Sequence, residues 1–139
     1  MVDGDTVHSD AQRRALDAGR SAFGAEWRPD RIAIAPGRLE LLGNHIDYNG
    51  GPVLAAAIDR FVVVTAENGS QDRDGLNVVM ADVADGGAAR IQPSSLVEWR
   101  NDSPPPASLD YVRGVIAAAL ARPGVQLAVP ARVSVDGDV

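Results

Sequence analysis

A short, turn-rich stretch of the sequence gathers side chains that could bind and activate a polar ligand. Arg38 carries a permanent positive charge, and Asn44, His45 and Asp47 follow within the same stretch. The imidazole and the carboxylate can accept hydrogen bonds, the amide can donate and accept them, and the guanidinium can neutralise developing negative charge. Turns between strands display such groups to ligands. The set therefore suits a ligand that bears several hydroxyl groups and is being phosphorylated.

Other interpretations of the same stretch are available. Tyr48 can face a ligand or simply pack, and the sequence leaves both possibilities open. Asn49-Gly50-Gly51 can form a nest of N–H groups for an anion, although a simple chain reversal into the next strand is the expectation we favour.

A metal site is not expected from these residues. His45 and Asp47 could form a ligand pair, but a protein metal site needs three or four ligands. The only other histidine of the sequence is His8, close to the N-terminus. No cysteine is present, which excludes disulfides, thiolate nucleophiles and cysteine-based zinc sites.

The composition of the chain excludes several classes of function. All 13 basic residues are arginine, so a Walker-type phosphate loop, which needs a lysine, is excluded. The formal net charge of −6 argues against nucleic acid and against anionic membranes as partners. Residues 1–10 lack the basic and apolar regions of a secretory signal, and no apolar run is long enough to span a bilayer. We therefore expect a cytoplasmic protein.

Strands on both sides must position the polar stretch. Residues 31–35 alternate as a strand does, and Pro36-Gly37 is expected to break that strand before a second apolar stretch at residues 39–42. After the polar stretch, residues 53–58 are apolar and residues 61–65 are β-branched, which favours a strand.

Two more strands are predicted at residues 76–80 and 126–135. Between the strands at 61–65 and 76–80, residues 67–75 carry the turn chemistry of a hairpin at Asn68-Gly69 and Asp74-Gly75, which would pair the two strands.

Two helices complete the predicted fold. One spans residues 10–24 with Ser9 or Asp10 as its cap, and residues 1–9 are expected to form a flexible tail. The other spans residues 109–121, capped by Ser108 and ended by Pro123-Gly124, with an apolar face at Val112, Val115, Ile116, Ala119 and Leu120. Helices and strands mixed along one chain predict an α+β fold, with a single domain over residues 10–139.

The segment at residues 35–54 closely resembles the galactokinase signature, in which a Pro-Gly-Arg turn leads to Gly-Glu-His-x-Asp-Tyr-Asn. The likeness continues more weakly at residues 110–115 and 133–139. It implies the N-terminal, sugar-binding part of a two-domain kinase of the GHMP superfamily, with a mixed or antiparallel sheet covered by helices. It also implies that the phosphate-binding loop and the partner aspartate of the family follow Val139, so we expect the chain to be truncated before them.

The resemblance assigns roles by position. Arg38 matches the arginine near the transferred phosphate, and His45 and Asp47 match ligands of the sugar hydroxyls. The same sugar-side loop of the family includes Asn44, Tyr48 and Gly50. ATP and Mg²⁺ are the implied cofactors, with their main binding elements beyond the chain. The implied activity is ATP-dependent phosphorylation of the anomeric hydroxyl of galactose or a galactose-like sugar.

Two positions depart from the pattern of the family. Asn44 stands where the family has Glu, at a position that contacts the sugar, so the identity of the sugar is left open. Glu40 stands where the family usually has Asn, and its even spacing from Asn44 could bring a carboxylate to the same strand face. A second function class therefore remains: a sugar-binding sensor without turnover, or a remnant of a kinase.

Overall fold

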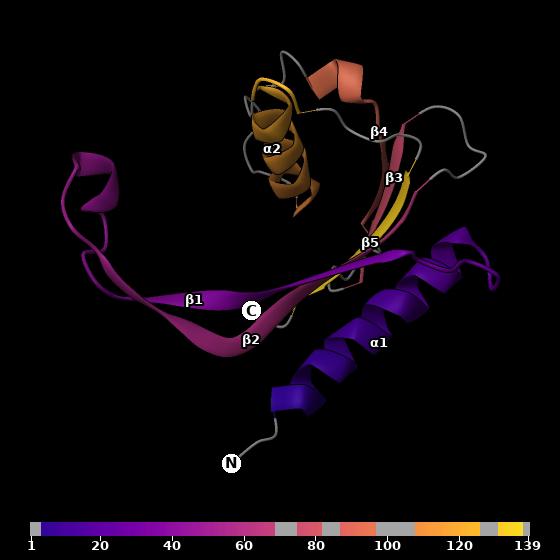
Figure 1. Cartoon of the computed structure of the whole chain (residues 1–139), viewed down its shortest axis with the longest axis horizontal. Helices are drawn as coiled ribbons and strands as arrows, with labels where there is room; N and C mark the ends of the chain where they lie inside the picture. Colours follow the sequence, from indigo (N-terminus) through magenta and orange to yellow (C-terminus); the bar gives the residue numbers. More distant parts are fainter. Residues whose placement is uncertain (1–3, 69–74, 82–86, 97–107, 126–130, 138–139) are drawn as a thin grey trace.

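A computed structural model describes residues 4–68, 75–81, 87–96, 108–125 and 131–137 (Figure 1). Five strands form one mixed sheet in the order β1-β2-β5-β3-β4. The strands are β1 (Arg31–Leu42), β2 (Leu54–Asn68), β3 (Leu76–Met80), β4 (Ala88–Ile91) and β5 (Ala131–Gly137). Helix α1 (Gly4–Phe23) lies on one face of the sheet and α2 (Ser108–Leu120) on the other (Figure 1). The predicted α+β class is confirmed.

The main hydrophobic core lies between the sheet and α2. Alternate residues of a strand face opposite sides, so Val133 and Val135 of β5 point toward this core while Ser134 and Asp136 point toward α1. Its buried members are Leu76, Val78, Ile91, Leu96 and Ala131. The side chains that α2 packs against them are Leu109, Val112, Ile116, Ala117 and Leu120.

The face of the sheet that α1 covers has fewer buried apolar residues and more buried polar ones. Ala11 and Ala15 of α1 are buried against Val63 of β2, and these small side chains allow the helix to lie close to the sheet. Arg14 of α1 donates two hydrogen bonds from Nε and Nη2 to Oδ2 of the buried Asp136, at 3.0 and 2.7 Å. An ion pair therefore joins α1 to β5 beside the small apolar contact.

Strand β1 does not end at Pro36-Gly37 as the sequence predicted. Pro36 pairs with Phe61 and Arg38 pairs with Ala57, so residues 58–60 of β2 lie opposite Gly37 alone. Such a bulge absorbs the turn-forming dipeptide without ending the strand, and β1 is an edge strand, where a proline without an N–H is tolerated. Beyond the bulge, residues 38–57 continue as a two-stranded arm that projects from the sheet (Figure 1).

The predicted hairpin between β2 and β3 is also wrong. Strand β5 lies between them, antiparallel to β2 and parallel to β3. The local turn chemistry therefore does not decide the pairing, and residues 69–74 lie outside the described residues. The predicted strand at residues 126–135 is described from Ala131 onward, and the sequence analysis did not predict β4 or the short 3₁₀ helix η2 (Pro93–Leu96).

The first helix begins earlier than predicted. Helix α1 starts at Gly4, inside the segment assigned to a tail, so that boundary is corrected for residues 4–9. Extending an existing helix is much easier than nucleating one, which explains how weak helix formers join its first turns. Helix α2 agrees closely with its prediction, except that Val115 is 71% exposed instead of lying on the apolar face. Among the described residues, no helix is long and apolar enough to cross a membrane.

Candidate functional site

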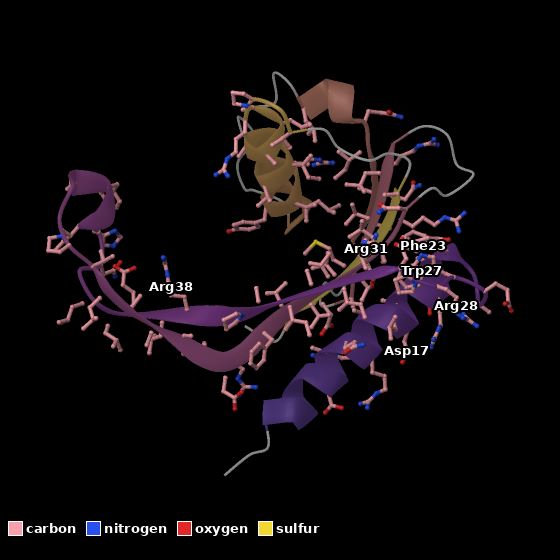
Figure 2. All side chains as sticks on the ribbon, in the orientation of Figure 1. Asp17, Phe23, Trp27, Arg28, Arg31 and Arg38 are labelled. Atoms are coloured by element: carbon pink, nitrogen blue, oxygen red, sulfur yellow. The ribbon has the colours of Figure 1, made fainter. Side chains whose placement is uncertain are left out.

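The predicted site residues all lie on the arm that β1 and β2 form beyond the bulge. Arg38 is the first paired residue of β1 after the bulge. The tip loop (residues 43–53), which joins β1 to β2, carries the rest: Asn44, His45, Asp47, Tyr48 and Gly50. The backbone of Asp47 begins the 3₁₀ helix η1 (Asp47–Asn49) at the centre of this loop. In Figure 2 the Arg38 side chain stands on the side of the arm toward which the tip loop curls.

The tip loop is held by its own hydrogen bonds. The Ile46 N–H donates to the Gly43 carbonyl at 2.9 Å, and the carbonyl of Ile46 accepts from Asn49 N–H at 2.9 Å and from Gly51 N–H at 3.0 Å. The Asn49 amide adds a bond from Nδ2 to the His45 carbonyl at 2.8 Å. The Asn49-Gly50-Gly51 segment therefore reverses the chain, as the favoured interpretation predicted.

Glycine is needed at two positions of the loop. Gly43 has φ of 97°, and a Cβ there would meet the Pro52 carbonyl oxygen at 2.8 Å. At Gly51 a Cβ would overlap Cγ2 of Ile46. Both substitutions would push the two sides of the loop apart, because the opposing atoms belong to the backbone or to a branched side chain.

His45 is the only non-glycine residue with positive φ among the described residues, at 66°. This left-handed conformation is uncommon for residues with a side chain. Backbone strain of this kind occurs often at sites that bind ligands. The imidazole of His45 meets the ring of Tyr48 edge to face, with 5.8 Å between centroids and 64° between planes. Tyr48 packs on His45 with one edge, but 71% of its surface remains exposed and is accessible to a ligand.

Arg38 and Glu40, the charged side chains of the arm that the structure describes, do not pair with each other. Arg38 is exposed and makes no ion pair or hydrogen bond among the described residues. Glu40, two residues further along β1, has a buried carboxylate oxygen, Oε1, that has no hydrogen-bond partner in the described part of the chain. The spacing in the sequence suggested that Glu40 could bring a carboxylate to the strand face of Asn44, but Glu40 was not among the predicted site residues.

The described side chains of the arm offer no carboxylate or imidazole cluster for a metal. Across the described ranges, no group of three or more His, Asp or Glu side chains could hold a metal ion. A hollow of about 420 Å³ lies elsewhere, lined by the end of α1 and by strands β3, β4 and β5. None of the predicted site residues lines this hollow.

Comparison with known proteins gives a family match over the part of the chain that contains the arm. The family described as the galactokinase galactose-binding signature matches residues 20–68, which run from the end of α1 through β1 and the tip loop to the end of β2. This range contains every site residue predicted from the sequence.

Whole-chain comparisons extend the likeness. The galactokinase of Canis lupus familiaris is 36% identical over 127 residues and that of Homo sapiens 35% over 128 residues. Each alignment covers 88% of this chain and 31% of the relative, so the chain spans about a third of the length of these relatives.

The fold also matches a solved structure. The crystal structure of Lactococcus lactis galactokinase complexed with galactose aligns with a TM-score of 0.65 at 21% identity, over 88% of this chain and 30% of that one. Signature, relatives and fold agree with one another. This chain belongs to the galactokinase family and corresponds to the N-terminal part of its members, which includes the galactose-binding signature.

Proposed function

We propose that this chain is the sugar-binding part of a cytoplasmic, ATP-dependent kinase that phosphorylates the anomeric hydroxyl of galactose or a galactose-like sugar. The observation that carries the proposal is the position of the galactose-binding signature, residues 20–68, which contains the whole arm and its tip loop. The internally bonded loop supports the proposal, because a preformed loop holds its polar groups ready for a sugar.

The proposed roles divide along the arm. His45 and Asp47 accept hydrogen bonds from sugar hydroxyls, and Tyr48 keeps the imidazole of His45 oriented through its edge contact. Gly50 lets the chain return toward β2 with its φ of 78°. Arg38 supplies positive charge to the phosphoryl group during transfer, so catalysis consists of positioning and charge stabilisation.

Among the described residues, Arg38 is the one that we expect to contact the phosphates of ATP. The exposed guanidinium of Arg38 has no competing ion pair among the described residues and can bind phosphate oxygens. The site offers no cluster of carboxylates in the described ranges, so Mg²⁺ would be held through the nucleotide phosphates and through residues of the whole protein beyond this arm.

Galactose binding by site variants tests the proposal. Asp47→Ala removes a charged acceptor and should raise the Kd of galactose about tenfold or more in calorimetric titration of the chain. His45→Ala should have a smaller effect, and Arg38→Ala should change the Kd less than about twofold, since its partner is the phosphoryl group. Asp59→Ala, which removes an exposed carboxylate of β2 outside the tip loop, is the control. Equal, small effects at all four positions would contradict the site assignment.

Turnover separates the kinase from the second candidate, a sugar sensor, which the amide of Asn44 favours. In a galactokinase-length protein that contains this segment, Arg38→Ala should lower kcat more than it raises KM. A sensor would bind galactose with the same affinity in both forms and transfer no phosphate from labelled ATP in either.

A further inference from the structure

Glu40 has the one buried carboxylate oxygen without a hydrogen-bond partner on the arm, as far as the described residues show. An ionised carboxylate can only accept hydrogen bonds, and leaving a buried acceptor unpaired is costly. Arg38 is near in sequence and positively charged, yet no ion pair joins the two. The oxygen therefore requires a donor that the described part of the chain does not provide.

The register of the arm places Glu40 and Arg38 on one face. The pairing is regular from Arg38 to Glu40, with Arg38 opposite Ala57 and Glu40 opposite Ala55. Residues two apart on a strand point to the same side, about 7 Å from each other. Both partners across the strand pair are alanines, which leave this face shallow between the charged side chains. A small ring can therefore lie on the alanines with one edge at Arg38 and another at Glu40.

We propose that Glu40 is a specificity-determining residue whose buried carboxylate oxygen accepts a hydrogen bond from one hydroxyl of the sugar bound at the arm. The inference rests on the proposed function, because it assumes that the sugar binds between the tip loop and Arg38. A hydroxyl supplies the missing donor, and a sugar without that hydroxyl leaves the carboxylate unpaired again. Sites built to hydrogen-bond a hydroxyl reject analogues that lack it for this reason.

The proposal predicts opposite effects on affinity and stability. Glu40→Gln keeps the shape of the side chain and replaces the charged acceptor by an amide. Without sugar, the variant should be at least as stable as the parent chain, because a neutral amide replaces a charged acceptor that has one buried oxygen without a hydrogen bond. With galactose, the Kd should rise about tenfold, the usual loss for a hydrogen bond to a charged group.

A panel of deoxygalactoses identifies the hydroxyl. For one member of the series the Kd should be equal in the parent chain and in Glu40→Gln, because the bond is already absent from that ligand. For the other members the tenfold difference should persist. Glu67→Gln is the control: Glu67 also has a buried carboxylate oxygen without a hydrogen bond, but it lies at the far end of β2, 3.8 Å from Nη1 of Arg132.

Each result is informative. An unchanged Kd in Glu40→Gln alongside weakened binding in Asp47→Ala would reject the role of Glu40 and leave the proposed function standing. A uniform loss over all deoxygalactoses, or a fall in melting temperature, would show that Glu40 acts on the fold of the arm instead of on a hydroxyl. Absence of galactose binding by the parent chain would overturn the proposed function itself.

Discussion

The residues of the tip loop show how a short sequence can define a candidate site. Asn44, His45 and Asp47 are neighbours in sequence and remain neighbours in the fold, because the loop closes on itself through hydrogen bonds of its own backbone. Those backbone hydrogen bonds join residues 43–51 to one another, so these neighbours are held together without a distant segment of the described chain. A site of this kind is predictable from sequence, since its composition and its location coincide.

Asn44 is the position at which a single substitution should change the preference for sugars. Asn44→Glu adds a carboxylate to the tip loop and should strengthen galactose binding by about tenfold through a charge-assisted hydrogen bond. It should weaken the binding of galacturonate, whose carboxylate would meet a like charge. Titration of both sugars into the parent chain and the variant checks the prediction.

The control for this substitution is Asp59→Asn, which changes the net charge by one unit of the opposite sign outside the loop and should leave the ratio of the two Kd values unchanged. If Asn44→Glu shifts neither sugar, the side chain at position 44 does not reach the ligand. An equal shift for both sugars would point to an effect on the loop and not on recognition.

The buried oxygen of Glu40 marks the limit of residue-level prediction. Its type and position are visible in the sequence, but its lack of a partner follows from the pairing of β1 with β2 and from the packing around it. Spacing alone cannot show which polar groups are left unsatisfied, because that depends on every neighbour in space.

At the scale of the elements, the ion pair between α1 and β5 should contribute to stability. Arg14→Ala leaves the carboxylate of Asp136 buried without its bidentate partner. Breaking a fully buried pair costs more, but the Arg14 side chain is 47% exposed, so we expect a loss of about 1–3 kcal/mol in the free energy of unfolding. Urea denaturation followed by circular dichroism measures it.

Arg13→Ala provides a control on the same helix. Arg13 pairs with Asp10 at 2.8 Å, but both side chains are at least half exposed, so the change should stay within about 0.5 kcal/mol. Equal losses for Arg13→Ala and Arg14→Ala would mean that the effect comes from the helix itself and that the ion pair to Asp136 adds nothing.

The elements also show which features the sequence could not predict. Helix α2 and strand β3 follow from local periodicity, and both appear at the expected residues. The bulge opposite Gly37 and the insertion of β5 between β2 and β3 depend on pairing between distant segments. Turn-forming residues at both ends of residues 68–75 suggested a hairpin. Such residues do not determine which strand pairs with β2, and in the structure that strand is β5.

At the scale of the whole molecule, the arm is the most exposed apolar part of the described chain. Its large side chains with half or more of their surface exposed are Leu39, Leu41, Leu42, Tyr48 and Leu54. Monomeric proteins rarely leave so many apolar groups together in water. We expect the chain alone to self-associate as its concentration rises.

Paired substitution at the arm tests this expectation. Leu42 and Leu54 face each other across β1 and β2, and replacing both with Ser should lower the weight-average mass in sedimentation at high concentration. The free energy of unfolding should change by less than about 0.5 kcal/mol, since both side chains are exposed. Val125→Ser, at an exposed apolar residue after α2, should leave the sedimentation unchanged. Self-association that persists in the double variant would place the contact elsewhere.

The place of β5 in the sheet has a consequence for how the protein is made. This strand comes last among the described elements, yet it pairs with both β2 and β3. While a ribosome is still adding residues before Ala131, the nascent chain can form a β1–β2 hairpin and a β3–β4 hairpin but cannot join them. During that interval, the edges of β2 and β3 that β5 joins in the finished sheet have no partner strand. The five-stranded sheet therefore closes only after β5 has been made, and until then the two open strand edges can pair with other strands.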